Sequence, residues 1–286
     1  MSATILAALT AARQRIPAAE ARLLLGHVLG RSSVWLEMYR DDSLTHVAAT
    51  SFADLVERRV AGEPVAYLLG TREFYGRDFF VSPAVLIPRP ETELLVECGI
   101  RKVDDRRKSP WDAHDTTAIL DLGTGSGCLA ISLALELPDA QVSAVDVSTE
   151  ALTVAHINAA RLGARVRFFE GDWFGGLPSQ TFDLIVANPP YVAAGDSHLT
   201  AGDLRFEPPG ALTDHADGLT AIRRIVGEAN DWLNPGGWLL FEHGYDQAQT
   251  ARELLAAAGF VAIEQQCDLA GIVRVSGGRH SAPSMT

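Results

Sequence analysis

From residue 117 onward, short apolar runs alternate with stretches of helical periodicity, and this alternation restricts the fold more than any other feature. The first four runs, rich in Val, Ile and Phe, occupy residues 118–123, 141–147, 165–170 and 182–188. Such runs are typical of strands buried on both faces. Helical periodicity separates the first three runs, at residues 128–137 and 149–162. The pattern predicts an α/β fold, with helices on both faces of a mostly parallel sheet.

The C-terminal part of the chain continues this pattern. Helices are predicted at residues 218–233 and 246–259, and strands at residues 236–244, 260–268 and 272–278. Together with the first four runs, these make a sheet of seven strands. We expect the last residues, 281–286, to form a disordered tail.

The N-terminal part has a different character. Residues 1–62 are predicted to form a small domain of short helices, with breaks at Pro17, Gly30 and Gly62. Residues 63–88 contain two β-prone runs around Gly70–Gly76, which predict a β-hairpin linker.

The sheet-bearing domain is assigned to residues 89–280. A helix is expected to begin near Pro90, because proline suits the first helical position and Glu91 and Glu93 follow in the first turn. The charged, unperiodic stretch 103–117 is predicted to be a surface loop.

Composition is that of a globular protein. The 286 residues are 47% hydrophobic and 21% charged, which suits one large domain with a smaller companion. No apolar run approaches the roughly 20 residues that span a bilayer, and the N-terminus does not resemble a signal peptide. The three cysteines lie far apart, and the eight histidines show no metal-binding spacing. We therefore expect a cytoplasmic protein with no disulfide framework and no metal.

The net charge of −12 is unevenly distributed. Residues 1–83 carry nine basic and nine acidic residues, so the remaining residues carry 15 basic and 27 acidic ones. An acidic body disfavours non-specific binding to a phosphate backbone. The charge therefore counts against a nucleic-acid substrate.

A glycine-rich turn lies between the first predicted strand and the helix that follows it. Its residues, in the stretch ILDLGTGSG, are Gly123, Thr124, Gly125, Ser126 and Gly127. Glycines allow the backbone to approach a ligand closely. The spacing is neither that of dinucleotide-binding folds nor that of a nucleotide-triphosphate loop. Alone, the turn is equally consistent with a tight strand–helix connection.

Acidic and aromatic residues end the next two predicted strands. Asp146 follows the glycine turn by about twenty residues, where a carboxylate is able to accept both hydroxyls of a ribose. Asp172 is able to accept from an adenine amino group, and Trp173 or Phe174 to cover the adenine face. The alternatives are a helix cap for Asp146 and core positions for both rings. Together with the glycine turn, these residues favour a nucleoside-containing ligand.

The fourth predicted strand ends in Asn188, Pro189, Pro190 and Tyr191. Two consecutive prolines stop a strand and stiffen the chain that follows it. The side-chain oxygen of Asn188 and the carbonyl of Pro189 are each able to accept one N–H bond from a planar NH2 group, and Tyr191 is able to stack on that group. Such bonds would hold the nitrogen of that group in a fixed plane. A rigid turn is the alternative.

Three other residues at element ends are ambiguous. Glu242 and His243 end a later predicted strand, and Arg89 precedes the helix near Pro90. Each is able to face a pocket, but residues at such positions are more often structural.

The four strand-end motifs, in this order and spacing, resemble the class I S-adenosylmethionine-dependent methyltransferases, which have a Rossmann-like domain. The stretches IPRPETE, DLGTGSG, GDWF, VANPPYV, GDLRFEP and FEHG together resemble the release-factor glutamine methyltransferases (HemK/PrmC-like). The resemblance extends over roughly residues 55–280. IPRPETE combined with GDLRFEP is more specific than NPPY, which other N-methyltransferases share.

The resemblance implies transfer of a methyl group from S-adenosylmethionine to the side-chain nitrogen (N5) of the glutamine in the Gly-Gly-Gln motif of class I peptide-chain release factors. It implies that Gly123–Gly127 surround the methionine moiety, Asp146 binds the ribose and Trp173 lies at the adenine. Asn188, Pro189, Pro190 and Tyr191 would hold the glutamine amide, and Asn188 would also border the cofactor. The N-terminal helices would help to grip the release factor.

Three alternatives are open. An adenine N6-methyltransferase acting on nucleic acid uses the same NPPY chemistry, but the acidic body and the lack of a basic target-reading segment argue against it. A cofactor-binding module without catalysis is a second alternative, which the complete NPPY motif argues against. A dehydrogenase is disfavoured by the glycine spacing.

Overall fold

The computed structural model describes residues 3–108, 116–200 and 202–281. It divides into two compact units, each with its own hydrophobic core. The first comprises Met1–Arg72 and Thr200–Phe206, and the second comprises Glu73–Leu199 and Glu207–Thr286. The short segment 200–206 belongs to the first unit although it lies far along the chain, which the sequence did not predict.

The first unit is helical, as predicted. Its helices are α1 (Ile5–Ala12), α2 (Ala18–Leu29), α3 (Ser33–Met38), α4 (His46–Val60) and α5 (Val65–Leu69). The hydroxyls of Thr4, Ser32 and Thr45 cap α1, α3 and α4 by accepting a backbone N–H from the first turn. The apolar faces of these helices meet in one cluster that includes Leu24 and Leu25. The predicted strand in the first of the two β-prone runs is partly wrong, because residues 65–69 form the helix α5.

The predicted hairpin is present but shorter. Strands β1 (Thr71–Phe74) and β2 (Arg77–Phe80) pair in a two-stranded sheet. Tyr75 and Gly76 both have positive φ, 51° and 72°, as a two-residue turn between twisted strands requires. The Glu93 side chain accepts the Tyr75 N–H at 2.9 Å, which ties the turn to the next helix.

That helix begins where the sequence placed it. A 3-10 turn, η1 (Pro90–Thr92), leads into α6 (Glu93–Arg107). The predicted loop at 103–117 is wrong in its first part, because α6 continues to Arg107. Residues 109–115 of that loop lie outside the described residues, as does almost all of the predicted tail.

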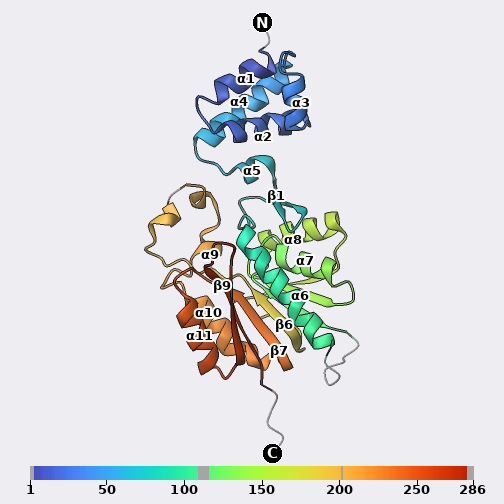
Figure 1. Ribbon diagram of the computed structural model, residues 1–286, viewed down its shortest axis with the longest axis vertical. Helices are drawn as coiled ribbons and strands as arrows, with labels where there is room; N and C mark the ends of the chain where they lie inside the picture. Colours follow the sequence, from blue (N-terminus) through green and yellow to red (C-terminus); the bar gives the residue numbers. More distant parts are fainter. Residues whose placement is uncertain (1–2, 109–115, 201, 282–286) are drawn as a thin grey trace, which may run out of the picture. The chain divides into compact units, whose positions relative to one another are not determined.

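The second unit is built on the predicted seven-stranded, mostly parallel sheet (Figure 1). Its strands are β3 (Ala118–Leu122), β4 (Gln141–Asp146), β5 (Val166–Glu170), β6 (Phe182–Ala187), β7 (Leu233–Glu242), β8 (Val261–Cys267) and β9 (Val273–Arg279). Their order is β5-β4-β3-β6-β7-β9-β8, and β9 runs opposite to the other six strands. β7 begins three residues before the predicted strand.

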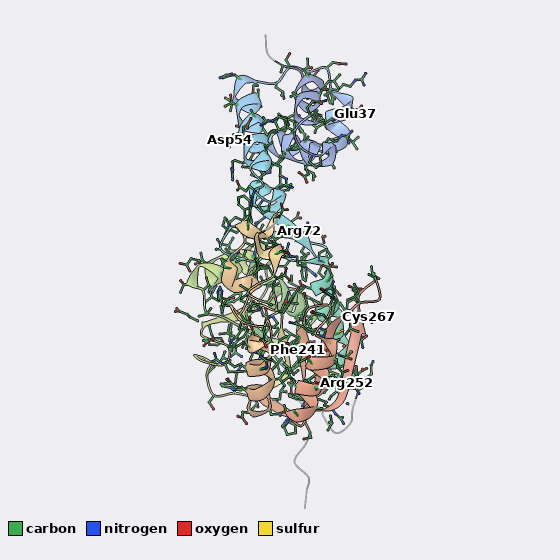
Figure 2. The ribbon with its side chains drawn as sticks, turned by 90° about the vertical axis from the view of Figure 1, so that its left-hand side faces the viewer. Glu37, Asp54, Arg72, Phe241, Arg252 and Cys267 are labelled. Atoms are coloured by element: carbon green, nitrogen blue, oxygen red, sulfur yellow. The ribbon has the colours of Figure 1, made fainter. Side chains whose placement is uncertain are left out.

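Helices cover both faces of this sheet. On one face lie α6, α7 (Cys128–Glu136) and α8 (Thr149–Leu162), and on the other lie α10 (Thr220–Glu228) and α11 (Ala248–Ala257). Successive residues of β6 alternate between the two cores, with Leu184 and Val186 in one and Ile185 and Ala187 in the other. Phe241 of β7 lies inside the unit, whereas Arg252 of α11 is exposed (Figure 2).

The strand order places a crevice at the centre of the sheet. The chain moves outward from β3 through β4 to β5, then returns to the other side of β3 with β6. In open α/β sheets, ligands bind at the carboxyl ends of the strands where the order reverses in this way. The predicted motifs follow β3, β4, β5 and β6, so the fold brings all of them to this edge.

Candidate functional site

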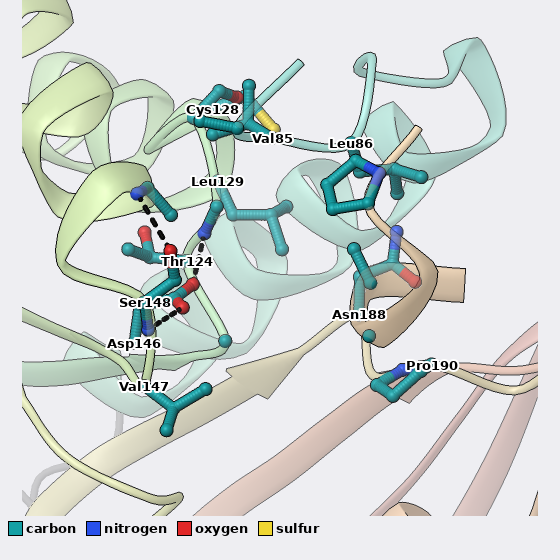
Figure 3. A pocket seen from close by; sticks show the side chains of 18 of the residues that line it. Val85, Leu86, Thr124, Cys128, Leu129, Asp146, Val147, Ser148, Asn188 and Pro190 are labelled. Atoms are coloured by element: carbon teal, nitrogen blue, oxygen red, sulfur yellow. Dashed lines mark hydrogen bonds between the residues drawn. The ribbon is translucent and has the colours of Figure 1, made fainter. Parts of the chain in front are cut away.

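A cavity of about 250 Å³ lies at this crevice in the second unit (Figure 3). Nine predicted site residues line it: Gly123, Thr124, Gly125, Ser126, Asp146, Asp172, Trp173, Asn188 and Pro190. Residues 84–92, ahead of α6, and the short helix α9 (Pro209–Leu212) contribute to its wall. Three predicted residues, Gly127, Pro189 and Tyr191, are outside the set of described residues that line it.

The glycine turn is fixed by the neighbouring strand. The N–H groups of Gly123 and Thr124 both donate to the carbonyl of Val145, at 2.9 and 3.0 Å. A Cβ on Gly123 would lie 3.4 Å from the Trp173 ring, and φ at Gly123 is +71°. Only glycine therefore allows both the turn and the close approach of the indole.

Gly127 has a structural reason to be glycine. Its φ is +82°, it precedes the first residue of α7, and a Cβ there would lie 2.8 Å from Ile131 and 3.2 Å from Ala155. The residue brings α7 close to α8. Its predicted contact with a cofactor remains a prediction.

Asp146 ends β4 and faces the cavity. Its Oδ2 accepts the Gly125 N–H at 2.8 Å, and its Oδ1 accepts the Ser148 N–H at 2.9 Å. These bonds fix the plane of the carboxylate (Figure 3). Burial raises the pKa of Asp146, although the backbone donors oppose the shift. Each oxygen keeps a lone pair for a further donor, which is what two ribose hydroxyls require.

Asp121 is a residue to which the sequence analysis gave no role. It is fully buried at the end of β3, and its Oδ2 accepts from the Thr124 hydroxyl at 2.6 Å and from the Ala130 N–H at 3.2 Å. Its Oδ1 has no hydrogen-bond partner among the described residues. Burial raises the pKa of Asp121 to about 7. Asp121 is not among the residues that line the cavity, and its bonds to Thr124 and Ala130 hold the glycine turn against the start of α7. The only signal in the sequence was its place at a strand end.

Of the residues that follow β5, some line the cavity and one is buried in the hydrophobic core. Trp173 lines the cavity in a left-handed conformation, with φ at 55°. Phe174 is instead buried and stacks on Trp232 at 5.5 Å between ring centroids, so it is a core residue. Asp172 is mostly exposed, and its Oδ2 forms an ion pair with Arg224 at 2.5 Å. That pair competes with the predicted contact to adenine.

Asn188 and Pro190 lie across the cavity from Asp146 (Figure 3). Asn188 Nδ2 donates to Thr92 Oγ1 at 3.1 Å. The Tyr191 hydroxyl donates to Glu242 Oε1 at 3.2 Å, and its ring packs against the sheet core. Burial raises the pKa of Tyr191 well above its usual range. The NPPY tyrosine is thus held by the protein, and its predicted stacking on an acceptor is a separate, untested role.

Glu242, which the sequence left ambiguous, is the last residue of β7 and is 1% exposed. Its Oε2 accepts from the Thr92 hydroxyl at 2.7 Å. Burial raises the pKa of Glu242 to about 7, and the two hydroxyl donors oppose that shift. Thr92, in the IPRPETE stretch, is the member of this group that the sequence analysis missed.

Arg89 and His243 also have defined partners. Arg89 lines the cavity, and its Nη2 contacts Glu207 Oε1 at 2.5 Å. The buried Glu207 also accepts the Ile87 N–H at 2.9 Å, so the IPRPETE and GDLRFEP stretches are joined by one carboxylate. His243 is buried, and its ring nitrogens contact the Gly244 carbonyl and the Ser276 hydroxyl. Burial lowers the pKa of His243, which favours a structural, neutral ring.

Residues 3–108, 116–200 and 202–281 contain neither a metal-binding cluster nor a membrane-spanning helix. No group of three or more His, Cys, Asp or Glu side chains there is arranged to hold a metal ion. In the same residues, no helix has the length and apolar character needed to cross a membrane.

Family models and named relatives both match this chain. Residues 3–70 match the family model "PrmC N-terminal domain", and residues 109–207 match "Methyltransferase small domain". A release factor glutamine methyltransferase of Bordetella pertussis is 52% identical over 92% of this chain and 95% of its own length. One from Vibrio cholerae is 44% identical over 98% of both chains.

Solved structures agree on the fold. A methyltransferase from Pyrococcus furiosus superposes with a TM-score of 0.52 and 18% identity, covering 80% of this chain and 100% of that one. At this identity, the likeness concerns the fold alone.

Proposed function

Because the chain belongs to the release factor glutamine methyltransferase family, we propose that it transfers a methyl group from S-adenosylmethionine to a glutamine side chain of a class I peptide-chain release factor. The acceptor is the N5 nitrogen of the Gly-Gly-Gln glutamine, and the modification modulates translation termination. The observation that carries this proposal is identity of about half over more than nine-tenths of the chain. The cytoplasm, where release factors act, is the proposed location.

The cavity residues fit the proposed cofactor. S-adenosylmethionine carries an ammonium group, a ribose and an adenine. The two half-used Asp146 oxygens suit the ribose hydroxyls. Trp173, against Gly123, offers a flat face for the adenine. Gly125 has φ at +55° and open space where a Cβ would be, so its backbone is able to approach the methionine part.

The bound cofactor supplies an electrophilic methyl group and a neutral leaving group. The protein's task is then to hold the acceptor nitrogen in line. In this proposal, Asn188 Oδ1 and the Pro189 carbonyl each accept one N–H of the glutamine amide. These bonds fix the plane of the nitrogen and withdraw proton charge as its bond to the methyl carbon forms. The nitrogen then loses one of its two protons to water.

Mass spectrometry tests the proposal. A release factor is incubated with the protein and S-adenosylmethionine, beside a release factor that lacks the glutamine and beside the Asn188→Ala enzyme. We expect one added methyl group, on the Gly-Gly-Gln glutamine, which is absent from the first control. Asn188→Ala is expected to keep most of its affinity for the cofactor and to turn over roughly 100- to 1000-fold more slowly, as in the loss of one oxyanion-hole donor.

The adenine alternative is tested in the same assay. An adenine-containing DNA or RNA oligonucleotide replaces the release factor, because an adenine amino group offers the same planar NH2. We expect no transfer to it. Transfer to the oligonucleotide and none to the release factor would overturn the proposed acceptor while leaving the proposed cofactor site intact.

A further inference from the structure

Four side chains form a continuous hydrogen-bonded network beside the cavity. Asn188 Nδ2 donates to Thr92 Oγ1 at 3.1 Å, and the Thr92 hydroxyl donates to Glu242 Oε2 at 2.7 Å. The Tyr191 hydroxyl donates to the other oxygen of the same carboxylate, at 3.2 Å. The four residues come from η1, the segment after β6 and the end of β7. Three segments distant in sequence are therefore joined through the Glu242 carboxylate.

The proton directions in this network follow from Glu242. An ionised carboxylate only accepts hydrogen bonds, and a threonine hydroxyl has a single proton. Because Thr92 gives that proton to Glu242, only an oxygen lone pair faces Asn188. That lone pair requires a donor, so the NH2 end of the Asn188 amide is held at Thr92. The carbonyl oxygen, Oδ1, is the end left for a ligand.

We propose that Glu242 and Thr92 are positioning residues, which fix the Asn188 amide with its oxygen presented to the acceptor nitrogen. The inference rests on the proposed function, in which Asn188 Oδ1 accepts an N–H of the substrate amide. An Asn amide held only by its own torsions is able to present NH2 instead, and two NH2 groups repel each other. In a similar way, a buried carboxylate fixes the tautomer of a catalytic histidine through a hydrogen bond.

The burial of Glu242 supports this role. A carboxylate that is 1% exposed carries a large desolvation penalty, and its two hydroxyl donors offset only part of it. No ion pair with Glu242 occurs among the described residues. Burying an apolar side chain would cost less free energy, so a carboxylate at this position indicates a function for its charge or hydrogen bonds.

Protonation of Glu242 would reverse the network. A neutral carboxyl is able to donate to Thr92, whose hydroxyl proton is then free to turn toward Asn188 and select its oxygen. Desolvation, and to a smaller extent the Glu91 charge, raise the pKa of this carboxyl, whereas the Thr92 and Tyr191 hydroxyls and the Arg274 charge lower it. Cys128 on α7 also senses the Glu242 charge, and burial raises the pKa of that thiol to about 12, so it stays neutral.

Three variants test the inference. Thr92→Ser keeps the hydroxyl, Thr92→Val keeps the shape without the hydroxyl, and Glu242→Gln keeps the shape without a titratable group. For each, we would measure the dissociation constant of S-adenosylhomocysteine, and kcat and KM for the release factor. The kinetic constants would be measured between about pH 6 and 9, where a carboxyl with a pKa near 7 titrates.

We expect Thr92→Ser to match the wild type. Thr92→Val is expected to lower kcat by about 10- to 100-fold, as the loss of an outer positioning partner does, with an unchanged affinity for S-adenosylhomocysteine. In the wild type, kcat should fall on the acid side of about pH 7, and Glu242→Gln should abolish that acid limb. A purely structural role would not make kcat depend on pH in this residue-specific way.

Two results would overturn the inference: wild-type kcat in Thr92→Val, or an acid limb that persists in Glu242→Gln. If Thr92→Val does not fold, the pH profile of Glu242→Gln decides alone. Failure of the proposed function is distinguishable, because the wild-type enzyme would then leave the release factor unmodified at every pH.

Discussion

Asp146 and Asp172 have the same side chain at the ends of neighbouring strands, yet their surroundings differ. The Asp146 carboxylate is held by two backbone N–H groups inside the cavity wall. The Asp172 carboxylate is exposed and paired with Arg224. Sequence reasoning assigned both residues to the cofactor, whereas in the structure one Asp172 oxygen is engaged in an exposed ion pair with Arg224.

The first prediction follows from this contrast. Asp146→Asn should weaken binding of S-adenosylhomocysteine by about 10- to 100-fold, because hydrogen bonds to a charged group contribute about 1.5–3 kcal/mol. Asp172→Asn is the matched variant and should change affinity little, since an exposed ion pair contributes at most about 1 kcal/mol. Isothermal titration calorimetry measures both. An equal loss in the two variants would restore the predicted contact between Asp172 and adenine.

Glu242 gives a second prediction, on stability. Burial raises the pKa of Glu242 to about 7, so the folded protein holds this proton more tightly than the unfolded chain does. The resulting contribution to stability is fully present below the unfolded pKa of about 4.3 and is lost as the pH rises through about 7. Glu242→Gln removes this dependence. Its free energy of unfolding, relative to wild type, should therefore rise between about pH 5 and 8.

Chemical denaturation at several pH values checks this second prediction. The exposed residue Glu253 on α11 gives the control variant Glu253→Gln. A difference between Glu242→Gln and wild type that stays constant with pH would contradict the raised pKa.

At the scale of elements, Asn158 of α8 joins the hairpin to the glycine turn. Its Oδ1 accepts the Phe80 N–H at 2.7 Å, and its Nδ2 donates to the carbonyls of Phe80 and Ser126, both at 2.9 Å. The side chain is fully buried. It thus bonds both backbone groups of a β2 residue as a neighbouring strand would.

The third prediction concerns that link. Asn158→Ala leaves three backbone groups without their partner, and each unsatisfied buried group costs about 1–3 kcal/mol, with some relief from water. We expect the free energy of unfolding to fall by about 2–4 kcal/mol. The control Gln249→Ala removes an exposed bond to Glu253 within α11 and should cost less than about 0.5 kcal/mol. Urea denaturation compares the two, and equal losses would show that the hairpin link contributes nothing.

Local sequence patterns predicted most helices and strands. The two errors below occurred where the local pattern favoured another structure. Residues 65–69 contain Val, Tyr and Leu, which suit a strand, but they form α5 after Pro64 and pack on the helical core. Residues 103–107 are charged, which suits a loop, but they continue α6, with Val103 buried against the sheet. Tertiary packing decided both cases, because a few buried side chains outweigh weak local preferences.

At the scale of the whole molecule, none of the three hydrophobic clusters mixes residues of the two units: the buried residues of one all lie within 5–68, and those of the other two all lie within 74–275. All residues of the proposed cofactor site belong to the second unit. Ligand binding stabilises the elements that it contacts.

The fourth prediction therefore concerns hydrogen exchange. Saturating S-adenosylhomocysteine should slow amide exchange in residues 123–127 and 188–191, and leave α1 to α4 unchanged. Mass spectrometry of peptides measures this in the full chain. Protection confined to the N-terminal helices would place the cofactor site elsewhere.

The sequence by itself determined the sheet, its burial and the motifs at the strand ends, because these depend on periodicity and on residues that are neighbours along the chain. Only the tertiary structure decided which distant residues bond to one another beside these motifs. Thr92 meets Glu242 across 150 residues, and Arg89 meets Glu207 across 118. Locally, each of these four resembles a turn or strand-end residue. Their roles arise from burial and partners, and the folding of distant segments against one another supplies both.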